Sequence, residues 1–407
     1  MNNKPYNAVG IDVSKGKSTI AVMRPFGEIV LSPFEITHSS SDLKMLSNTL
    51  KELDGDTRII MEYTGKYYQP IAHFLYDSGF FVSVIHAKLI HDFANNSIRK
   101  IKTDKADAVK IANYGLTNWQ DLKPFSKDDN IRTLLKSCNR QYNLYMRQYV
   151  TAKNNLISLL DQTCPGVDKI VAGKRRPNGQ TKWIDFAHRF WHCDYITNFS
   201  ENKFIETFNE WSKKNGYKSD SLKASQIYHH AKDCVPTLPK NDYTKAIIRN
   251  AAEDAQHISA LIIATQTEMN RLAELLPEYP IVMSFKGIGE TLGPQLMAEI
   301  GDVRRFPNRS NLIAYAGLDT PPFQSGKYEA KTRHISKRGS GDLRKTLFQV
   351  VGVIQQQQMY GDPVHEFIAK KKVEGKPYYV CMTAGCNKFL RIYYARVKEY
   401  LNNIENI

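Results

Sequence analysis

Four acidic residues in the first part of the chain have the types and the spacing that metal-dependent chemistry on a phosphodiester needs. Asp12 and Glu62 each end an apolar run, and Asp104 and Asp107 stand three residues apart at the expected start of a helix, on one face of it. A phosphodiester under attack develops charge on the attacking and leaving oxygens, and two Mg²⁺ ions about 4 Å apart, held by carboxylates, stabilise that charge. Together the four acids predict a Mg²⁺ site, although each alone is more simply explained as a solvated strand end or a helix cap.

The elements that must position these acids alternate between strands and helices. Turn residues and apolar runs predict strands over 7–14, 18–23, 28–34, 58–61 and 80–85, and helices from about 41, over 67–76 and over 105–114. Three strands that can pair as a meander, followed by strands alternating with helices, favour a mixed sheet covered by helices. This is the order found in ribonuclease-H-like nucleases and integrases, where the strands that end at Asp12 and Glu62 are neighbours.

Two long helices are predicted in the middle of the chain, over 131–160 and 246–276, and they are able to form an antiparallel coiled coil within one chain or between subunits. The less regular stretch between them holds a basic run at 174–176, which is followed by several aromatic residues. Basic and aromatic residues together can grip single-stranded nucleic acid. They also describe the core and solvated face of a small helical insert, and we favour that second interpretation.

The last third of the chain is basic and punctuated by glycine. Lys286, Gly287 and Gly289 form a turn that opens a helix, which suits either a helix-hairpin-helix that binds a DNA phosphate or a plain helical hairpin. The cations Lys327, Arg333, Lys337 and Arg338 follow and suit phosphate contacts. Ser325 precedes a glycine in a proline-rich loop near these cations, a position from which it could act as a nucleophile on phosphorus. On chemistry alone, Ser336 and Ser340 are equally good candidates.

Charge and composition narrow the class of partner. The 407 residues predict two or three domains, and a net charge of +15 favours a polyanionic partner. A run of roughly 18 apolar residues, which a spanning helix needs, is missing, and so is a signal-peptide pattern at the N-terminus. We therefore expect nucleic acid as the partner, no membrane, and a cytoplasmic location. The six cysteines contain no C-x-x-C pair, so neither a zinc site nor a disulfide framework is expected.

With these motifs in view, the chain resembles the transposases of insertion-sequence family one hundred and ten, which include pilin-gene invertases. The N-terminal resemblance covers about 7–155 and carries the family's RuvC-like DEDD pattern, with all four acids present. The C-terminal resemblance covers about 280–370. The matching motifs are VGIDVSK (9–15), MEYTG (61–65), KTDKADA (102–108), GIG (287–289), AEIGD (298–302), AYAGL (314–318) and ISKRG (335–339).

The resemblance implies a recombinase guided by a bridge RNA that the element encodes, acting on target and donor DNA. It further implies Mg²⁺ at Asp12, Glu62, Asp104 and Asp107, a phosphoserine link formed by Ser325, and a tetramer built as a dimer of dimers, associated with the bacterial nucleoid. The expected domains are a RuvC-like domain (1–125), a coiled-coil linker (126–279) with an insert at about 163–240, and a mainly helical serine transposase domain (280–407). The insert is longer than the family pattern leads us to expect.

Two other functions remain open on sequence grounds. A RuvC-type structure-specific endonuclease would use the same acids with metal-activated water and would need no serine. A domesticated nucleic-acid-binding protein would keep the fold without the reaction, although the four intact acids argue against it.

Overall fold

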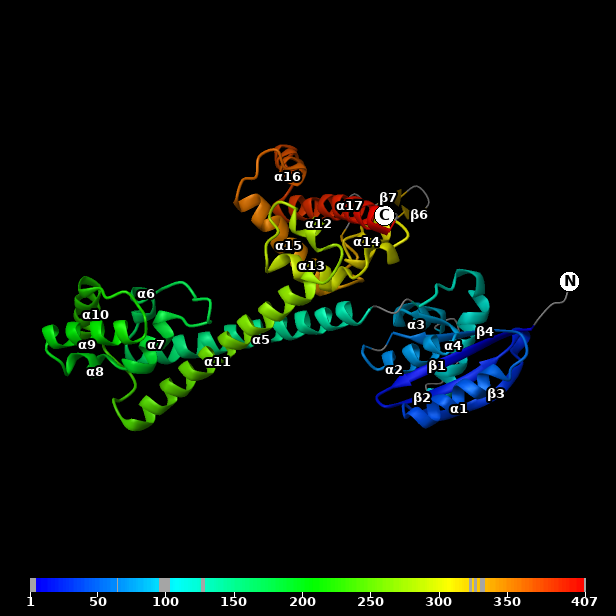
Figure 1. The fold of residues 1–407 in the computed structure, drawn as a ribbon, viewed down its shortest axis with the longest axis horizontal. Helices are drawn as coiled ribbons and strands as arrows, with labels where there is room; N and C mark the ends of the chain where they lie inside the picture. The colour runs from blue at the N-terminus through cyan, green and yellow to red at the C-terminus, as the bar shows by residue number, and fades with distance from the viewer. Residues whose placement is uncertain are drawn as a thin grey trace. The chain divides into compact units, whose positions relative to one another are not determined.

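The computed structural model describes residues 5–63, 65–94, 103–125, 129–321 and 334–405, with the backbone of 324–325 and 328–329. The chain divides into two compact units, Met1–Lys127 (unit 1) and Asp128–Ile407 (unit 2) (Figure 1). The boundary lies close to the one predicted at 125, whereas the boundary predicted at 279 stays a prediction.

Unit 1 contains a five-stranded mixed sheet in the order β3-β2-β1-β4-β5. The antiparallel meander predicted for the first three strands is present, and β4 and β5 then add parallel to β1. This confirms the mixed α/β fold expected for the N-terminal part. The strands are β1 (Tyr6–Ser14), β2 (Lys17–Met23), β3 (Ile29–Thr37), β4 (Asp56–Glu62) and β5 (Phe81–Ile85).

Helices cover both faces of this sheet, and the alternation of side chains along β1 separates the two faces. Val9, Ile11 and Val13 are buried in one core with α1 (Ser40–Lys51) and α2 (Gln69–Asp77). Ala8 belongs to the opposite core with α4 (Asp104–Thr117), and α3 (Ala87–Ala94) adds to that side. The even-numbered residues of β1, Asp12 among them, therefore belong to the α4 face. The sequence had not predicted α3.

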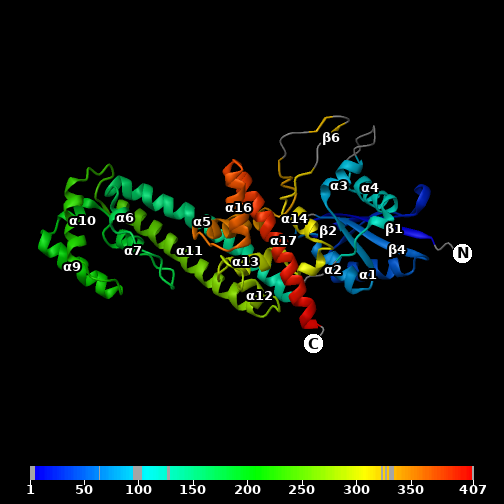
Figure 2. The ribbon, with the colours of Figure 1, turned by 90° about the horizontal axis from the view of Figure 1, so that it is seen from above.

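Unit 2 is built on two long helices, α5 (Asn130–Thr163) and α11 (Asp242–Glu274), which lie side by side in both ribbon views (Figures 1 and 2). Both correspond to helices predicted from the sequence. Between them the chain forms a helical insert of α6 (Val167–Ile170), α7 (Lys182–Arg189), α8 (Cys193–Thr197), α9 (Glu201–Lys214) and α10 (Ser221–Asp233).

The aromatic residues of the insert form its core. Trp183, Phe186, Phe190 and Trp191 are all buried, and they pack with Phe204 and Phe208 of α9. Their rings are therefore not available to stack on bases, which confirms the interpretation of this stretch as a folded insert.

The C-terminal part of unit 2 is mainly helical, as predicted. It shares one hydrophobic core with Leu135 of α5 and Met269 of α11, so the long helices also anchor this part. Its helices are α12 (Tyr279–Met283), α13 (Leu292–Ile300), α14 (Arg309–Tyr315), α15 (Gly341–Gln356), α16 (Pro363–Val373) and α17 (Tyr378–Glu405), with a short ribbon of β6 (Gln324–Ser325) and β7 (Tyr328–Glu329). No helix in the described ranges is both long and apolar enough to cross a bilayer.

Candidate metal centre and nucleic-acid surface

Asp12 and Glu62 lie at the same end of two neighbouring parallel strands. The β1–β4 register runs from Tyr6 opposite Asp56 to Ile11 opposite Met61, so Asp12 and Glu62 each follow the last pair. Both side chains are half-buried. This is the side-by-side placement predicted from the two apolar runs, and it follows because parallel strands end at one edge of a sheet.

Gly10 brings the start of α4 to the same edge. A Cβ atom at Gly10 would lie 2.1 Å from the Ala108 carbonyl oxygen and 2.4 Å from the Ala112 nitrogen, so only glycine allows the α4 backbone to pack this closely on β1. Helix α4 begins at Asp104, where Thr103 caps it by accepting a hydrogen bond from the Ala106 N–H at 3.2 Å. The aspartates of the first helical turn are thereby held near the strand ends.

The pKa of Asp12 is affected by the charges of the other three acids. Burial, and then the negative charges of Asp104, Asp107 and Glu62, raise the pKa of Asp12 from 3.8 to about 6. Burial and Asp107 likewise raise the pKa of Glu62, against the opposing effect of His86 and His91. The four predicted carboxylates thus form one electrostatic cluster in unit 1.

A lysine on α4 lies beside the cluster. Lys110 donates to Asp107 at 2.8 Å from the next turn of α4. In the described residues, no three of the four carboxylates bring oxygens within 4.8 Å of one another. A donor set of carboxylate oxygens fits a hard divalent cation, and Asp12, Glu62, Asp104 and Asp107 are the residues that would hold it.

The predicted phosphate-binding turn in unit 2 has an unusual backbone. Gly287 adopts φ +79° between α12 and α13, and a Cβ there would lie 2.7 Å from Ile354 Cγ1, whereas a Cβ on Gly289 would meet open space. Lys286 is exposed beside this turn. The two short helices joined by glycines match a helical hairpin with an accessible turn, and phosphate binding by it stays a prediction.

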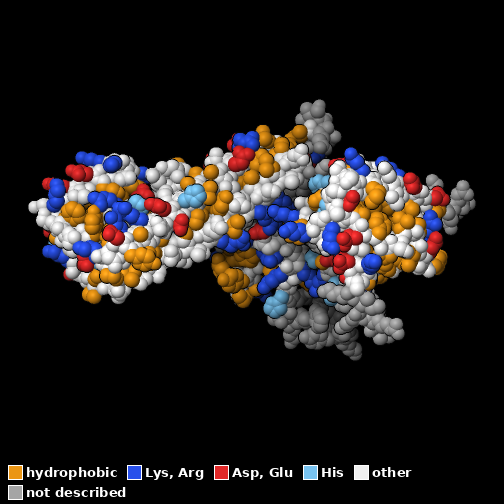
Figure 3. Space-filling view, turned by 90° about the horizontal axis from the view of Figure 1, so that it is seen from below, with side chains coloured by type: hydrophobic (Ala, Val, Ile, Leu, Met, Phe, Trp, Pro, Cys, Tyr) orange, Lys and Arg blue, Asp and Glu red, His pale blue; other side chains and the backbone are white. Residues whose placement is uncertain are grey.

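Lys337 and Arg338 are exposed on a segment packed against the end of α14. The Lys337 N–H donates to the Gly317 carbonyl at 3.1 Å, and Gly339 is in such close contact that a Cβ would lie 2.2 Å from the Tyr315 carbonyl oxygen. A rigid backbone therefore presents these two cations to solvent. On the face seen in Figure 3, Lys and Arg side chains form a dense group near the middle of the picture, and others are scattered singly.

The serines that competed for the role of nucleophile differ in their surroundings. Ser336 donates to the Asp319 carboxylate, and Ser340 donates to Glu299 at 3.0 Å while it caps α15. Both hydroxyls thus hold the local structure. Ser325 is in β6, opposite Tyr328 of β7. Its side chain, and Lys327 and Arg333 entirely, lie outside the described residues, so their predicted roles stay predictions.

Two family matches fall on the two regions that carry these candidate residues. Residues 9–165 match the DEDD domain of the IS110 transposases, described as "Transposase". Residues 279–363 match the family described as "Transposase IS116/IS110/IS902 family". These two matches together cover more than half of the chain, which belongs to the IS110/IS116/IS902 transposase family.

Similar proteins span most of this transposase at low identity. The "Pilin gene-inverting protein" of Moraxella bovis is 23% identical over 343 residues, which cover 84% of this chain and 80% of that protein. The "Insertion element IS110 uncharacterized 43.6 kDa protein" of Streptomyces coelicolor is 20% identical over 340 residues, 84% of this chain and 82% of that protein. The "Putative transposase y4rJ" of Sinorhizobium fredii is 40% identical over 73 residues, 18% of each chain.

Two histidines beside the acids of the transposase were missed by the sequence analysis. His86 follows β5 and His91 is on α3, and both are close enough to Glu62 to lower its pKa. The signal that could have found His86 was its position directly after a parallel strand, at the edge where Glu62 ends β4. His91 gave no such signal, because α3 was not predicted.

Proposed function

We propose that this transposase cuts and rejoins DNA with Mg²⁺ held by Asp12, Glu62, Asp104 and Asp107. The single observation that carries the proposal is the placement of these acids. Asp12 and Glu62 end neighbouring parallel strands, and α4, which begins at Asp104, packs on β1 at Gly10, so that the charges of the other acids raise the pKa of Asp12. Acids that repel one another in this way are suited to binding a cation rather than to stabilising the fold.

In this proposal the carboxylates orient the scissile phosphodiester and its metal ions. Mg²⁺ bound there would act as a Lewis acid on the phosphate oxygens and offset the charge that develops on them. Lys110 limits the negative charge on Asp107, and the close packing of Gly10 on α4 holds the strand-end and helix-start acids together.

We further propose, on the resemblance alone, that Ser325 is the nucleophile. Its Oγ would form a bond to phosphorus while a bond from phosphorus to a deoxyribose oxygen breaks, and that oxygen would leave with a proton. A hydroxyl of a second DNA strand would then attack the phosphoserine, so that strand exchange needs no external energy source. A guide RNA from the element and a dimer of dimers would bring target and donor DNA together.

Strand cleavage tests the role of the acids. We expect Asp12→Asn to lower the Mg²⁺-dependent cleavage rate more than about 100-fold, since even the outer partners of metal ligands contribute 10- to 100-fold. The matched control is Glu52→Gln, an exposed acid of the same unit, which should cleave as the wild type does. Equal rates for Asp12→Asn and the wild type would overturn the metal site.

A denaturing gel tests the serine separately. With guide RNA, paired DNA substrates and Mg²⁺, the wild type should give a covalent protein–DNA adduct that Ser325→Ala abolishes and Ser336→Ala keeps. Cleavage to free 5′-phosphate ends without an adduct would overturn the serine and leave a metal-dependent nuclease. Cleavage that is unchanged when the guide RNA is omitted would overturn the guide.

A further inference from the structure

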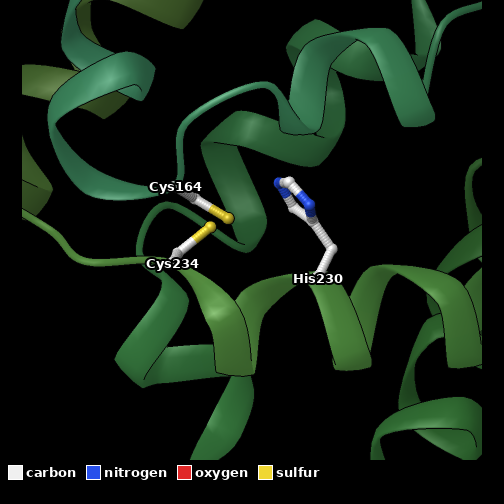
Figure 4. A group of neighbouring side chains, drawn as sticks. All are labelled: Cys164, His230 and Cys234. Carbon is white, nitrogen blue, oxygen red and sulfur yellow. The ribbon is translucent and has the colours of Figure 1, made fainter.

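Three potential metal ligands that are distant in sequence meet in the helical insert. Cys164 follows the last residue of α5, while His230 and Cys234 are one turn apart at the end of α10. One ligand atom from each residue lies within 4.8 Å of the other two. In Figure 4 the two thiols point toward each other, and the His230 ring lies on the same side of its helix as they do.

The donor types select the class of ion. Two thiolate sulfurs and an imidazole nitrogen are soft or borderline ligands, which suit Zn²⁺ and not the hard cation expected at the acids of unit 1. With Zn–S near 2.3 Å and Zn–N near 2.0 Å, ligand atoms in a tetrahedral site stand about 3.5–3.8 Å apart. Side-chain rotations that move the ligand atoms by roughly 1 Å would therefore be enough to bring them to these distances.

The contacts of the group centre on one backbone carbonyl. His230 Nε2 lies 2.7 Å from the Pro165 oxygen, and the Cys234 thiol donates to the same oxygen at 3.9 Å. Those two contacts hold the turn after α5, and they point the imidazole and the thiol at the residue next to Cys164. A bound ion would take over this function, because it would join the same two side chains to Cys164 directly.

A third cysteine lies nearby. Cys193, at the start of α8, is buried in the same hydrophobic core as Cys164, and Cys234 packs against that core. Three of the six cysteines of the chain therefore gather in the insert, from positions 164, 193 and 234. The neighbouring group of His192, Cys193 and Asp194 is explained differently, since His192 Nδ1 caps α8 by accepting from the Asp194 N–H at 3.0 Å.

We propose that Cys164, His230 and Cys234 bind one Zn²⁺ ion, with water as the fourth ligand. The ion would join the end of α5 to the end of α10 and so close the insert onto the long helix. A metal that binds the folded insert more tightly than the unfolded chain stabilises it.

Metal analysis of the full-length protein tests the proposal. After purification under reducing conditions without chelator, we expect about one zinc per chain in the wild type and in Asp12→Asn. Exchange for Co²⁺ should give a thiolate-to-cobalt charge-transfer band, which oxygen ligands in unit 1 would not produce. Chelation should lower the Tm.

Variants identify the ligands. His230→Ala and Cys234→Ala, at partly exposed positions, should lose the zinc and the cobalt band, while Cys138→Ala, a half-buried thiol on α5, should keep both. Circular dichroism checks that each variant is folded. A folded wild type with no zinc and no thiolate-to-cobalt band would overturn the site.

Discussion

Buried acids in the two units have opposite surroundings. In unit 2, Glu278 is 1% exposed and accepts hydrogen bonds from the Arg132 guanidinium at 2.6 and 2.7 Å. Glu299 is fully buried and accepts from Asn139 at 2.7 Å and from Arg140 at 3.0 Å. In unit 1, the half-buried Asp12 faces three further acids, and its pKa is raised by burial and by their charges.

This difference separates acids that hold the fold from acids that are suited to a ligand. Desolvating a carboxylate costs free energy, which a guanidinium and full hydrogen bonding offset in unit 2. At Asp12 the neighbours add to the cost, so the metal-free cluster is a local source of instability. A bound cation would remove that instability.

The largest expected effect comes from removing one acid in each unit. Glu278→Gln should lower the free energy of unfolding of unit 2 by about 3–5 kcal/mol, because it leaves the buried Arg132 charge without its main partner. Glu62→Gln should leave the stability of unit 1 unchanged or raise it, since it removes a like charge. Urea titration in the presence of chelator measures both. Equal losses in the two variants would erase the distinction between the units.

Mg²⁺ should stabilise one unit only. At 10 to 100 times its Kd, Mg²⁺ should raise the free energy of unfolding of unit 1 by about 1.4–2.7 kcal/mol. The transition of unit 2 should not move, and the effect should vanish in Asp12→Asn. Thermal melts with increasing Mg²⁺ check this, and a Mg²⁺ effect that persists in Asp12→Asn would mean that the ion binds elsewhere.

The pH dependence of metal-free unit 1 should carry the signature of Asp12. Because burial and the other acids raise its pKa from 3.8 to about 6, the folded chain keeps a proton between these pH values that the unfolded chain loses. The contribution of Asp12 to the free energy of unfolding is therefore largest below about pH 4 and is lost as the pH rises to about 6. Wild type and Asp12→Asn should therefore be similarly stable below about pH 4, and the variant should be the more stable at pH 7. The urea midpoints of the two proteins are measured with chelator at each pH. A difference between wild type and Asp12→Asn that stays the same at all pH values would contradict the raised pKa.

The smallest effect extends the same comparison to cations. Arg344 donates to the Ala316 carbonyl at 3.0 Å, whereas Arg338 is exposed on the same region of unit 2. Arg344→Ala should cost about 1.5 kcal/mol or more of stability. Arg338→Ala should change stability by less than about 0.5 kcal/mol while reducing the salt slope of DNA binding by about one. A salt slope that Arg338→Ala leaves unchanged would remove this residue from the DNA-binding surface.

Much of unit 1 was predictable because its signals are local. Apolar runs gave the five strands, and parallel pairing then placed Asp12 beside Glu62 without further information. The helix α3 escaped prediction because it is short and follows a strand directly. In unit 2 the same periodicity gave α5 and α11, and the aromatic core of the insert was also anticipated.

By itself the sequence determined the mixed sheet, the long helices, the net positive charge and the four acids, because each is carried by residue type and short-range spacing. Only the tertiary structure decided which acids are paired and which repel, since Glu278 and Arg132 are 146 residues apart along the chain. It alone brought Cys164 to His230 and Cys234, a group that the search for C-x-x-C pairs could not find. Burial and contacts between residues that are distant in sequence determine the interactions of these side chains, and neither can be predicted from short-range spacing.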